Sequence, residues 1–267
     1  MTTPDHPALS QTSPQASARV LHVGEAALTA RQLVDEARRQ GLRWDDLPLA
    51  TTRRDWSTPL ARAQWAALGA AWLARLAVSA ARHDIVHIHS ASTYKHSQYA
   101  VQRFVLHAHG SDVRTAMYAE GSGELVRTAL TQAEAVLYST PDLAEHVLPV
   151  RPDAQYLPVP ITTRRLPAWQ PEAARPRIAF ASRWEDVKGL DTQLAVAAGL
   201  VEAVGDRADV VGLDWGPAAP AAAALGVRLV PKLPHTRYLD WLAGSMAVVG
   251  QSAGILSASE LEALGSG

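Results

Sequence analysis

Short apolar runs alternate with helix-like stretches along almost the whole chain, and this alternation constrains the fold more than any other feature. In the first half, apolar runs occupy residues 19–24, 84–89, 104–109 and 135–139. Strands that alternate with helices are typical of parallel sheets whose faces are covered by helices. The pattern therefore predicts an α/β protein with doubly wound parallel sheets.

A segment rich in proline and arginine interrupts this alternation. Residues 162–176, TTRRLPAWQPEAARP, contain three Pro and three Arg without an apolar period, which is typical of a linker. Strands and helices then resume from residue 177. The 267 residues suit two domains of about 130 each. We predict an N-terminal Rossmann-like domain over 19–161, a linker over 162–176, and a second Rossmann-like domain over 177–267, with the two domains facing a cleft.

The ends of the chain and its charge limit where it works and what it binds. Residues 1–18 are polar and rich in Pro, Ser and Thr, without a basic start or an apolar core, so we expect a disordered leader and not a signal peptide. The longest apolar stretch, Ala63 to Ala74, has twelve residues and is too short to span a bilayer. The net charge is −1, which gives no global field for nucleic acid. We expect a cytoplasmic protein without nucleic-acid partners or a transmembrane segment, and leave peripheral membrane contact open.

The turn after the first strand of the second half carries two cations. The stretch RIAFASRWEDVKGLD, residues 177–191, places Arg183 and Lys188 five positions apart before a helix. Two cations beside the free N–H groups of a helix start form a plausible diphosphate clamp. Taken alone, the stretch also fits an ordinary turn with two solvated cations. Its position at the first strand after the linker favours the clamp.

Two His-x-His pairs end neighbouring apolar runs. His87 and His89 share one face of a strand, as do His107 and His109. Two such pairs on adjacent strands could form a four-histidine metal site. However, the only carboxylate nearby is Asp112, and many kinds of site form at the carboxyl ends of parallel strands. We therefore predict no metal, and a metal-dependent hydrolase is the least favoured alternative.

The segment that follows the second pair is a candidate catalytic turn. His109, Gly110, Ser111 and Asp112 follow each other at a strand end. A histidine and an aspartate there can orient a hydroxyl or receive a developing charge, and we predict both as catalytic residues. The alternative is a turn in which Ser111 and Asp112 cap local amides.

Two further segments are candidates for contact with a nucleotide. Gly212 begins the strand-end turn GLDWGP, which could let a nucleotide lie on the backbone but is not the dinucleotide fingerprint G-x-G-x-x-G. Glu260 and Glu262 lie near the start of the last helix, where carboxylates can accept sugar hydroxyls. Turn chemistry and simple capping are the alternative interpretations.

In order, these segments resemble the GT-B glycosyltransferases, specifically the retaining family called GT4. The similarity rests on DIVHIHSA (84–91), FVLHAHGSD (104–112), AVLYSTPDLAEHV (135–147) and YLPVPI (156–161). In the second half, RIAFASRWEDVKGLD is similar to the family's Arg-x-x-x-x-Lys-Gly segment. The resemblance covers the chain from about Arg19 to its end.

This resemblance implies transfer of a sugar from a nucleotide-diphosphate-sugar to an acceptor hydroxyl in carbohydrate biosynthesis. The reaction would retain the anomeric configuration and need no metal or cofactor beyond the donor co-substrate. Arg183 and Lys188 would bind the donor diphosphate, Glu262 the nucleotide ribose, and His109 the sugar. The acceptor would be a carbohydrate or a lipid-linked molecule.

The chain departs from the family pattern at two places. Gly254 stands eight residues before Glu262, where the family has the first glutamate of a Glu-x7-Glu motif. Family members also continue for about another hundred residues. We therefore expect an incomplete second domain, truncated at its C-terminus, and leave open whether this chain alone is active. The alternative is a non-catalytic GT-B-like protein that binds a nucleotide-sugar or a partner.

Overall fold

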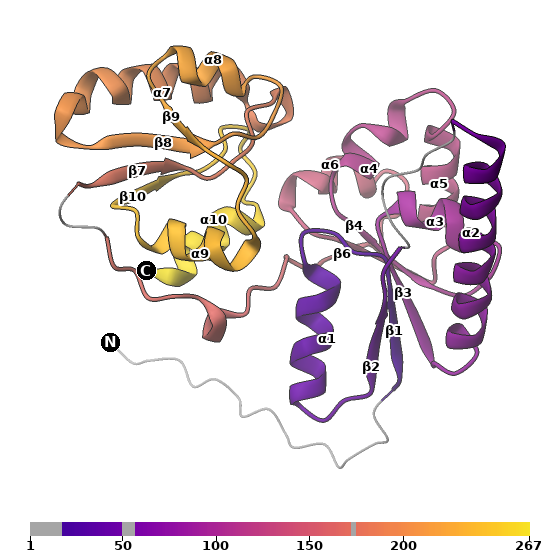
Figure 1. Cartoon of the computed structure of the whole chain (residues 1–267). Helices are drawn as coiled ribbons and strands as arrows, with labels where there is room; N and C mark the ends of the chain where they lie inside the picture. The colour runs from indigo at the N-terminus through magenta and orange to yellow at the C-terminus, as the bar shows by residue number, and fades with distance from the viewer. Residues whose placement is uncertain (1–17, 50–56, 172–174) are drawn as a thin grey trace.

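A computed structural model describes residues 18–49, 57–171 and 175–267, and these form two parallel sheets with helices on both faces (Figure 1). The first sheet has the strand order β2-β1-β3-β4-β5-β6 and the second has β10-β7-β8-β9. The predicted α/β class and its doubly wound sheets are confirmed. Of the leader predicted for residues 1–18, residues 1–17 lie outside the described part of the chain.

The order in which the chain adds strands to the first sheet reverses between β1 and β3. Its strands are β1 (Val20–Val23), β2 (Trp44–Leu47), β3 (Ile85–His89), β4 (Val105–Ala108), β5 (Ala135–Tyr138) and β6 (Gln155–Tyr156). The chain leaves β1 for β2 on one side and returns through β3 on the other. Such a reversal opens a crevice beyond the carboxyl ends of the two strands, where open α/β sheets bind their ligands.

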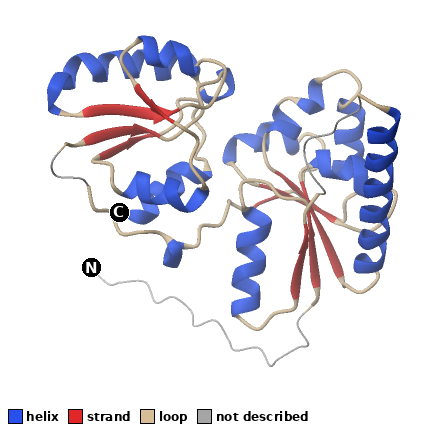
Figure 2. Cartoon of the chain, viewed as in Figure 1, coloured by secondary structure: helices blue, strands red, loops and turns tan. Residues whose placement is uncertain are grey.

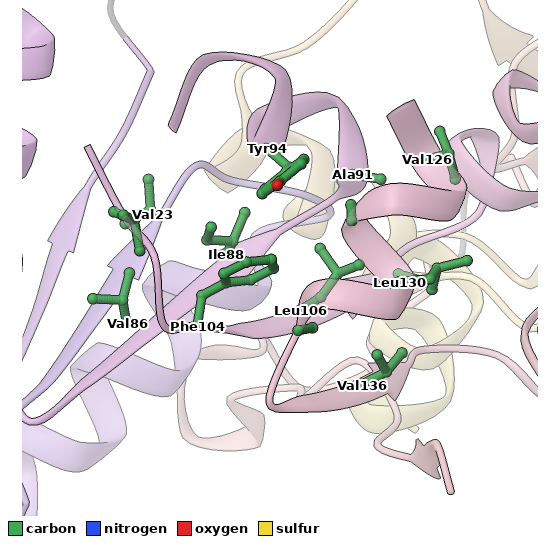
Figure 3. Close-up of a cluster of buried hydrophobic side chains, with 14 of the residues drawn as sticks. Val23, Val86, Ile88, Ala91, Tyr94, Phe104, Leu106, Val126, Leu130 and Val136 are labelled. Atoms are coloured by element: carbon green, nitrogen blue, oxygen red, sulfur yellow. The ribbon is translucent and has the colours of Figure 1, made fainter. Parts of the chain in front are cut away.

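One face of this sheet carries the apolar core. Alternate residues of the strands, including Leu21, Ile88 and Leu106, pack with Phe104 into a cluster of buried side chains (Figure 3). Helices α2 (Pro59–Ala80), α3 (Ala91–Ser97) and α5 (Gly123–Gln132) cover this face. Because successive strand residues point to opposite faces, this core leaves the residues between them on the other side of the sheet.

Helix α1 (Thr29–Arg39) covers the strands from the side opposite to α2 (Figure 1). It buries Ala30, Val34 and Ala37. The remaining helical segments of this half are α4 (Ser111–Arg114), η1 (Ala116–Tyr118), η2 (Pro141–Leu143) and α6 (Ala144–Val147).

The second sheet is smaller and is sandwiched between two pairs of helices. Its strands are β7 (Arg177–Phe180), β8 (Asp209–Leu213), β9 (Arg228–Val230) and β10 (Ala247–Val249). Helices α7 (Leu190–Val204) and α8 (Ala219–Ala224) cover one face, and α9 (His235–Ala243) and α10 (Ala258–Ser266) cover the other (Figure 2). Two short turns of helix, η4 (Asp186–Lys188) and η5 (Gly205–Arg207), flank α7.

The connection between the sheets lies along α1. The Thr162 amide and hydroxyl both donate to Gln32 Oε1, at 2.6 and 3.0 Å. The neighbouring η3 (Thr163–Arg165) carries two arginines that form ion pairs with carboxylates of α1. Arg164 pairs with Glu36 at 3.0 Å, and Arg165 pairs with Asp35 at 2.8 Å. The start of the segment predicted as a linker is therefore held against the first half, and residues 172–174 lie outside the described part.

Helix α2 contacts the core through its second half. Its N-cap is Thr58, whose side chain accepts a hydrogen bond from the Ala61 amide. Trp72 and Leu76 are buried in the core, whereas Leu60 and Leu68 are exposed. Among the described residues, no helix combines the length and apolarity required to cross a bilayer.

Candidate functional site

The candidate site begins at the turn between β7 and α7. Gly189 closes this turn with φ 72°, a left-handed conformation that glycine adopts without strain. A Cβ at Gly189 would also lie 2.6 Å from the Ser252 carbonyl carbon. Both constraints require glycine here, and they place Lys188 directly before the first turn of α7.

The turn gathers several charged groups. Arg183 pairs with Glu185 at 2.6 Å. Burial lowers the pKa of Lys188 first, and the charges of Arg183 and Arg114 lower it further, against opposing effects of Glu260 and Glu185. Arg183 and Lys188 thus lie within electrostatic reach of each other, and Arg114 of the first half, which itself pairs with Asp142 at 2.6 Å, also acts on Lys188. An anion bound here would relieve the repulsion between Arg183 and Lys188.

An exposed tryptophan adjoins the clamp. Trp215 lies with its ring centroid 5.2 Å from the Arg183 guanidinium carbon and 4.1 Å from Lys232 Nζ. Both cations thereby interact with the ring face. The sequence analysis missed Trp215 and Lys232 as site residues, and the only available signal was a tryptophan inside the turn that follows β8. The arrangement can stack a planar ring beside the cations.

The glycines of the turn after β8 have a packing role. A Cβ at Gly212 would lie 2.7 Å from the ring of Trp184, and at Gly216 it would collide with the Trp184 backbone. Trp184 is fully buried and donates its indole N–H to the Leu213 carbonyl at 3.1 Å. The backbone therefore needs glycine for the protein's own tryptophan. Contact between Gly212 and a nucleotide stays a prediction.

The two glutamates of α10 face different surroundings. Glu262 is 4% exposed and accepts a hydrogen bond from His235 Nε2 at 2.7 Å. It borders a cavity of about 350 Å³ that also includes residues of α1 and of the connection between the sheets. Glu260 accepts from the Gln251 amide at 2.8 Å and acts electrostatically on Lys188. The carboxylate nearer the clamp is thus Glu260, whereas contact of Glu262 with a ribose stays a prediction.

Gly254 provides no carboxylate to this region. It has φ 71°, and a Cβ built on it would meet nothing within 4 Å. Space for a side chain exists there, but the left-handed backbone disfavours one.

Asp112 caps backbone amides of the turn that joins β4 to α4, and its predicted catalytic role stays a prediction. Its carboxylate is 3% exposed and accepts hydrogen bonds from the amides of Gly110, Val113 and Ala91, at 2.9, 3.0 and 3.0 Å. The His109 amide approaches it at 3.3 Å. These amides occupy the acceptor sites of the carboxylate. We therefore assign Asp112 to the turn that joins β4 to α4, as in the alternative interpretation.

The two predicted histidine pairs lie together, and a fifth histidine joins them. Because His22 is the register partner of His87, and His89 of His107, the rings share one face of the sheet. Burial lowers the pKa of His22 and of His107 to about 4 each. It lowers the pKa of His87, His89 and His109 well below the ordinary value. The five rings are therefore neutral at pH 7.

Strained backbone lies at the same edge of the first sheet. Ala27, Leu28 and Ser90 have φ of 51°, 61° and 73°, which is unfavourable for residues with a Cβ. They follow β1 and β3, the two strands at the reversal of the sheet. Strain of this kind concentrates at ligand sites, which agrees with the position of His109 at the same edge.

Comparison with known proteins identifies the architecture. Neither protein-family models nor curated protein sequences gave a match. Among solved structures, a UDP-forming α,α-trehalose-phosphate synthase from Burkholderia xenovorans is similar with a TM-score of 0.62 at 10% identity, over 94% of this chain and 81% of that one. A trehalose-6-phosphate protein from E. coli bound with UDP-2-fluoro glucose gives 0.61 at 9%, over 93% and 82%. Anabaena HepE in complex with UDP and glucose gives 0.57 at 9%, over 87% and 73%. At these identities the similarity shows the fold alone, which is the two-domain, Rossmann-like GT-B fold.

Proposed function

We propose that the chain is a glycosyltransferase that moves a sugar from a nucleotide-diphosphate-sugar to an acceptor hydroxyl. The observation that carries this proposal is the position of Arg183 and Lys188 in the turn directly before α7, where Arg183 and Arg114 both act electrostatically on Lys188. A leaving nucleoside diphosphate gains negative charge as the glycosidic bond breaks, and preorganised cations stabilise that charge. Similar structures in complex with UDP and glucose or with UDP-2-fluoro glucose support a donor of this class.

The described side chains suggest how the donor lies. Its diphosphate would bind Arg183 and Lys188, and its base would stack near Trp215 beside Lys232. Gly212 and Glu262 are the further nucleotide contacts that we propose. His109 of the first half would face the sugar.

The finer features of the reaction rest on the resemblance to the GT4 family. We propose retention of configuration, and charge neutralisation by the cations in place of a metal at the diphosphate. The acceptor would be a carbohydrate or a lipid-linked molecule, and the protein would act in the cytoplasm.

Donor turnover tests this function. The purified chain is incubated with a panel of UDP-sugars and sugar acceptors, and release of UDP is measured. We expect release from at least one donor, and its loss in the double variant Arg183→Ala/Lys188→Ala because the leaving group is no longer neutralised. Arg62→Ala/Arg75→Ala removes two exposed arginines of α2 and serves as the control with the same charge change. Equal release by both double variants would refute the assignment of the clamp.

Gly254 favours a second candidate, a protein that binds a nucleotide-sugar without turnover. The position that the family fills with a carboxylate holds no side chain here, so one donor-sugar contact is missing. Binding of a UDP-sugar without release of UDP from any tested donor would support this alternative over the transferase.

A further inference from the structure

Five imidazoles form a continuous layer on one face of the first sheet, and we call His22, His87, His89, His107 and His109 the histidine layer. Successive rings are in contact, with centroids 4.8 Å apart for His22 and His87, and 4.4 Å for His87 and His89. The layer continues at 5.6 Å from His89 to His107, and at 4.2 Å from His107 to His109. It lies on the face opposite to the apolar core, and the site proposed above uses only His109.

The hydrogen bonds of the layer leave several buried ring nitrogens unpaired. In the part of the chain that the structure describes, His22 Nε2, His87 Nε2, His107 Nδ1 and His109 Nδ1 are buried without a partner. Buried polar atoms normally find a partner, because losing hydration without one is costly. Of these four residues, His107 and His109 also belong to a group of three histidines whose ring nitrogens lie within 4.8 Å of one another.

The tautomer of His107 is fixed by its surroundings. Its Nε2 lies 3.2 Å from the Leu157 carbonyl oxygen, which can only accept a hydrogen bond. The proton is therefore on Nε2, and the unpaired Nδ1 carries a lone pair. A histidine that donates one N–H to a backbone carbonyl and presents the other nitrogen as a lone pair has the usual arrangement of a metal ligand.

We propose that His89, His107 and His109 bind a first-row divalent metal ion, of which Zn²⁺ is the representative. One ring nitrogen from each residue can be chosen so that all three lie within 4.8 Å of one another. His89 Nδ1 and His109 Nε2 are already 3.0 Å apart, and two nitrogens on a tetrahedral zinc are separated by about 3.3 Å. The metal ion would take the place of the proton between these two atoms, and that proton would move to the other nitrogen of its own ring, so that each imidazole keeps one N–H.

The surroundings favour this set over the overlapping set of His22, His87 and His89. His107 has its carbonyl partner, and His89 Nε2 lies 2.9 Å from His22 Nδ1, so two ligands have a supporting hydrogen bond. His109 is the only partly exposed member of the layer, which provides a route for the ion. Three neutral imidazoles leave a fourth position for water.

Zinc binding by the full chain tests this inference independently of the donor site. The protein is prepared without a polyhistidine tag, treated with EDTA, exchanged into chelator-free buffer, and titrated with zinc chloride by calorimetry. We expect one zinc ion per chain. His107→Gln should weaken binding at least about tenfold, while the matched variant His87→Gln should bind as the wild type does. Absence of stoichiometric binding, unchanged affinity of His107→Gln, or equal loss in both variants would overturn the assignment.

Cobalt keeps the test decisive if a buried glutamine prevents folding. Co²⁺ added to the wild-type chain should give the strong visible absorption of a four- or five-coordinate site with nitrogen ligands, and zinc should displace it. A spectrum of hexaaqua cobalt alone would refute the site.

Discussion

Lys188 occupies surroundings that disfavour its own charge. Burial has the largest effect on its pKa, and Arg183 adds a like charge, so the pKa lies below the ordinary value of 10.5. A bound diphosphate would reverse the balance, because the anion favours the charged amine. Binding of the donor is therefore expected to be coupled to uptake of a proton by Lys188.

This coupling predicts how donor affinity depends on pH. Affinity for UDP should be greatest where free Lys188 is protonated and should fall by roughly tenfold or more as the pH rises through its lowered pKa. The sign follows from the direction of the shift, since at high pH binding must first recharge the amine. Calorimetry at several pH values above 7.5 measures this, and Lys188→Arg provides the control because a guanidinium stays charged. The same decline in both proteins would show that another group is responsible.

At the residue scale, sequence reasoning identified positions better than roles. The order of motifs located Arg183, Lys188 and the two histidine pairs. It could not show that three backbone amides occupy the Asp112 carboxylate, because one of them, from Ala91, belongs to a different strand end. It also missed His22, because the pairing of β1 with β3 is not encoded in the spacing of one segment.

At the scale of elements, the turn after β8 is shaped by Trp184. The tryptophan belongs to the β7–α7 turn and fills the space beside Gly212. The two turns that carry the proposed donor contacts are thus packed against each other. Substitutions in the turn after β8 should therefore affect the conformation of the β7–α7 turn.

A matched pair of glycine substitutions tests this packing. Gly212→Ala should destabilise the fold by about 1–3 kcal/mol, because the new methyl group meets a locked indole ring. Gly199→Ala should instead stabilise it by up to about 1 kcal/mol, because this residue lies within α7 with open space around it. Urea unfolding followed by circular dichroism measures both changes. A neutral or stabilising Gly212→Ala would show that Trp184 does not fix the turn.

The elements themselves were largely predictable, whereas their contacts were not. Apolar runs located most of the strands, including β3 and β4 within the runs at 84–89 and 104–109. Burial along α2 follows no such run, because the chain covers only the second half of this helix and leaves Leu60 and Leu68 exposed. The sequence also did not show which of Glu260 and Glu262 lies nearer to Lys188, because the direction of each side chain depends on how α10 packs.

At the scale of the molecule, charged side chains of the two halves interact with each other. Arg114 follows β4 and acts on Lys188, which follows β7. The connecting segment is held on α1 by ion pairs that include Arg164 with Glu36 at 3.0 Å. Exposed ion pairs contribute little stability individually, so we expect these pairs to add little to the stability of the fold.

The proposed function depends above all on the binding of a nucleoside diphosphate by Arg183 and Lys188. Calorimetric titration of the wild-type chain with UDP and with UMP tests it most directly, because the two ligands differ only in the β-phosphate. UDP should bind at least about tenfold more tightly than UMP, since charge-assisted hydrogen bonds to the extra phosphate are strong. In Arg183→Ala/Lys188→Ala this preference should disappear, while Arg62→Ala/Arg75→Ala should retain it. Equal affinities of the wild type for UDP and UMP, or a preference that survives in Arg183→Ala/Lys188→Ala, would contradict the account.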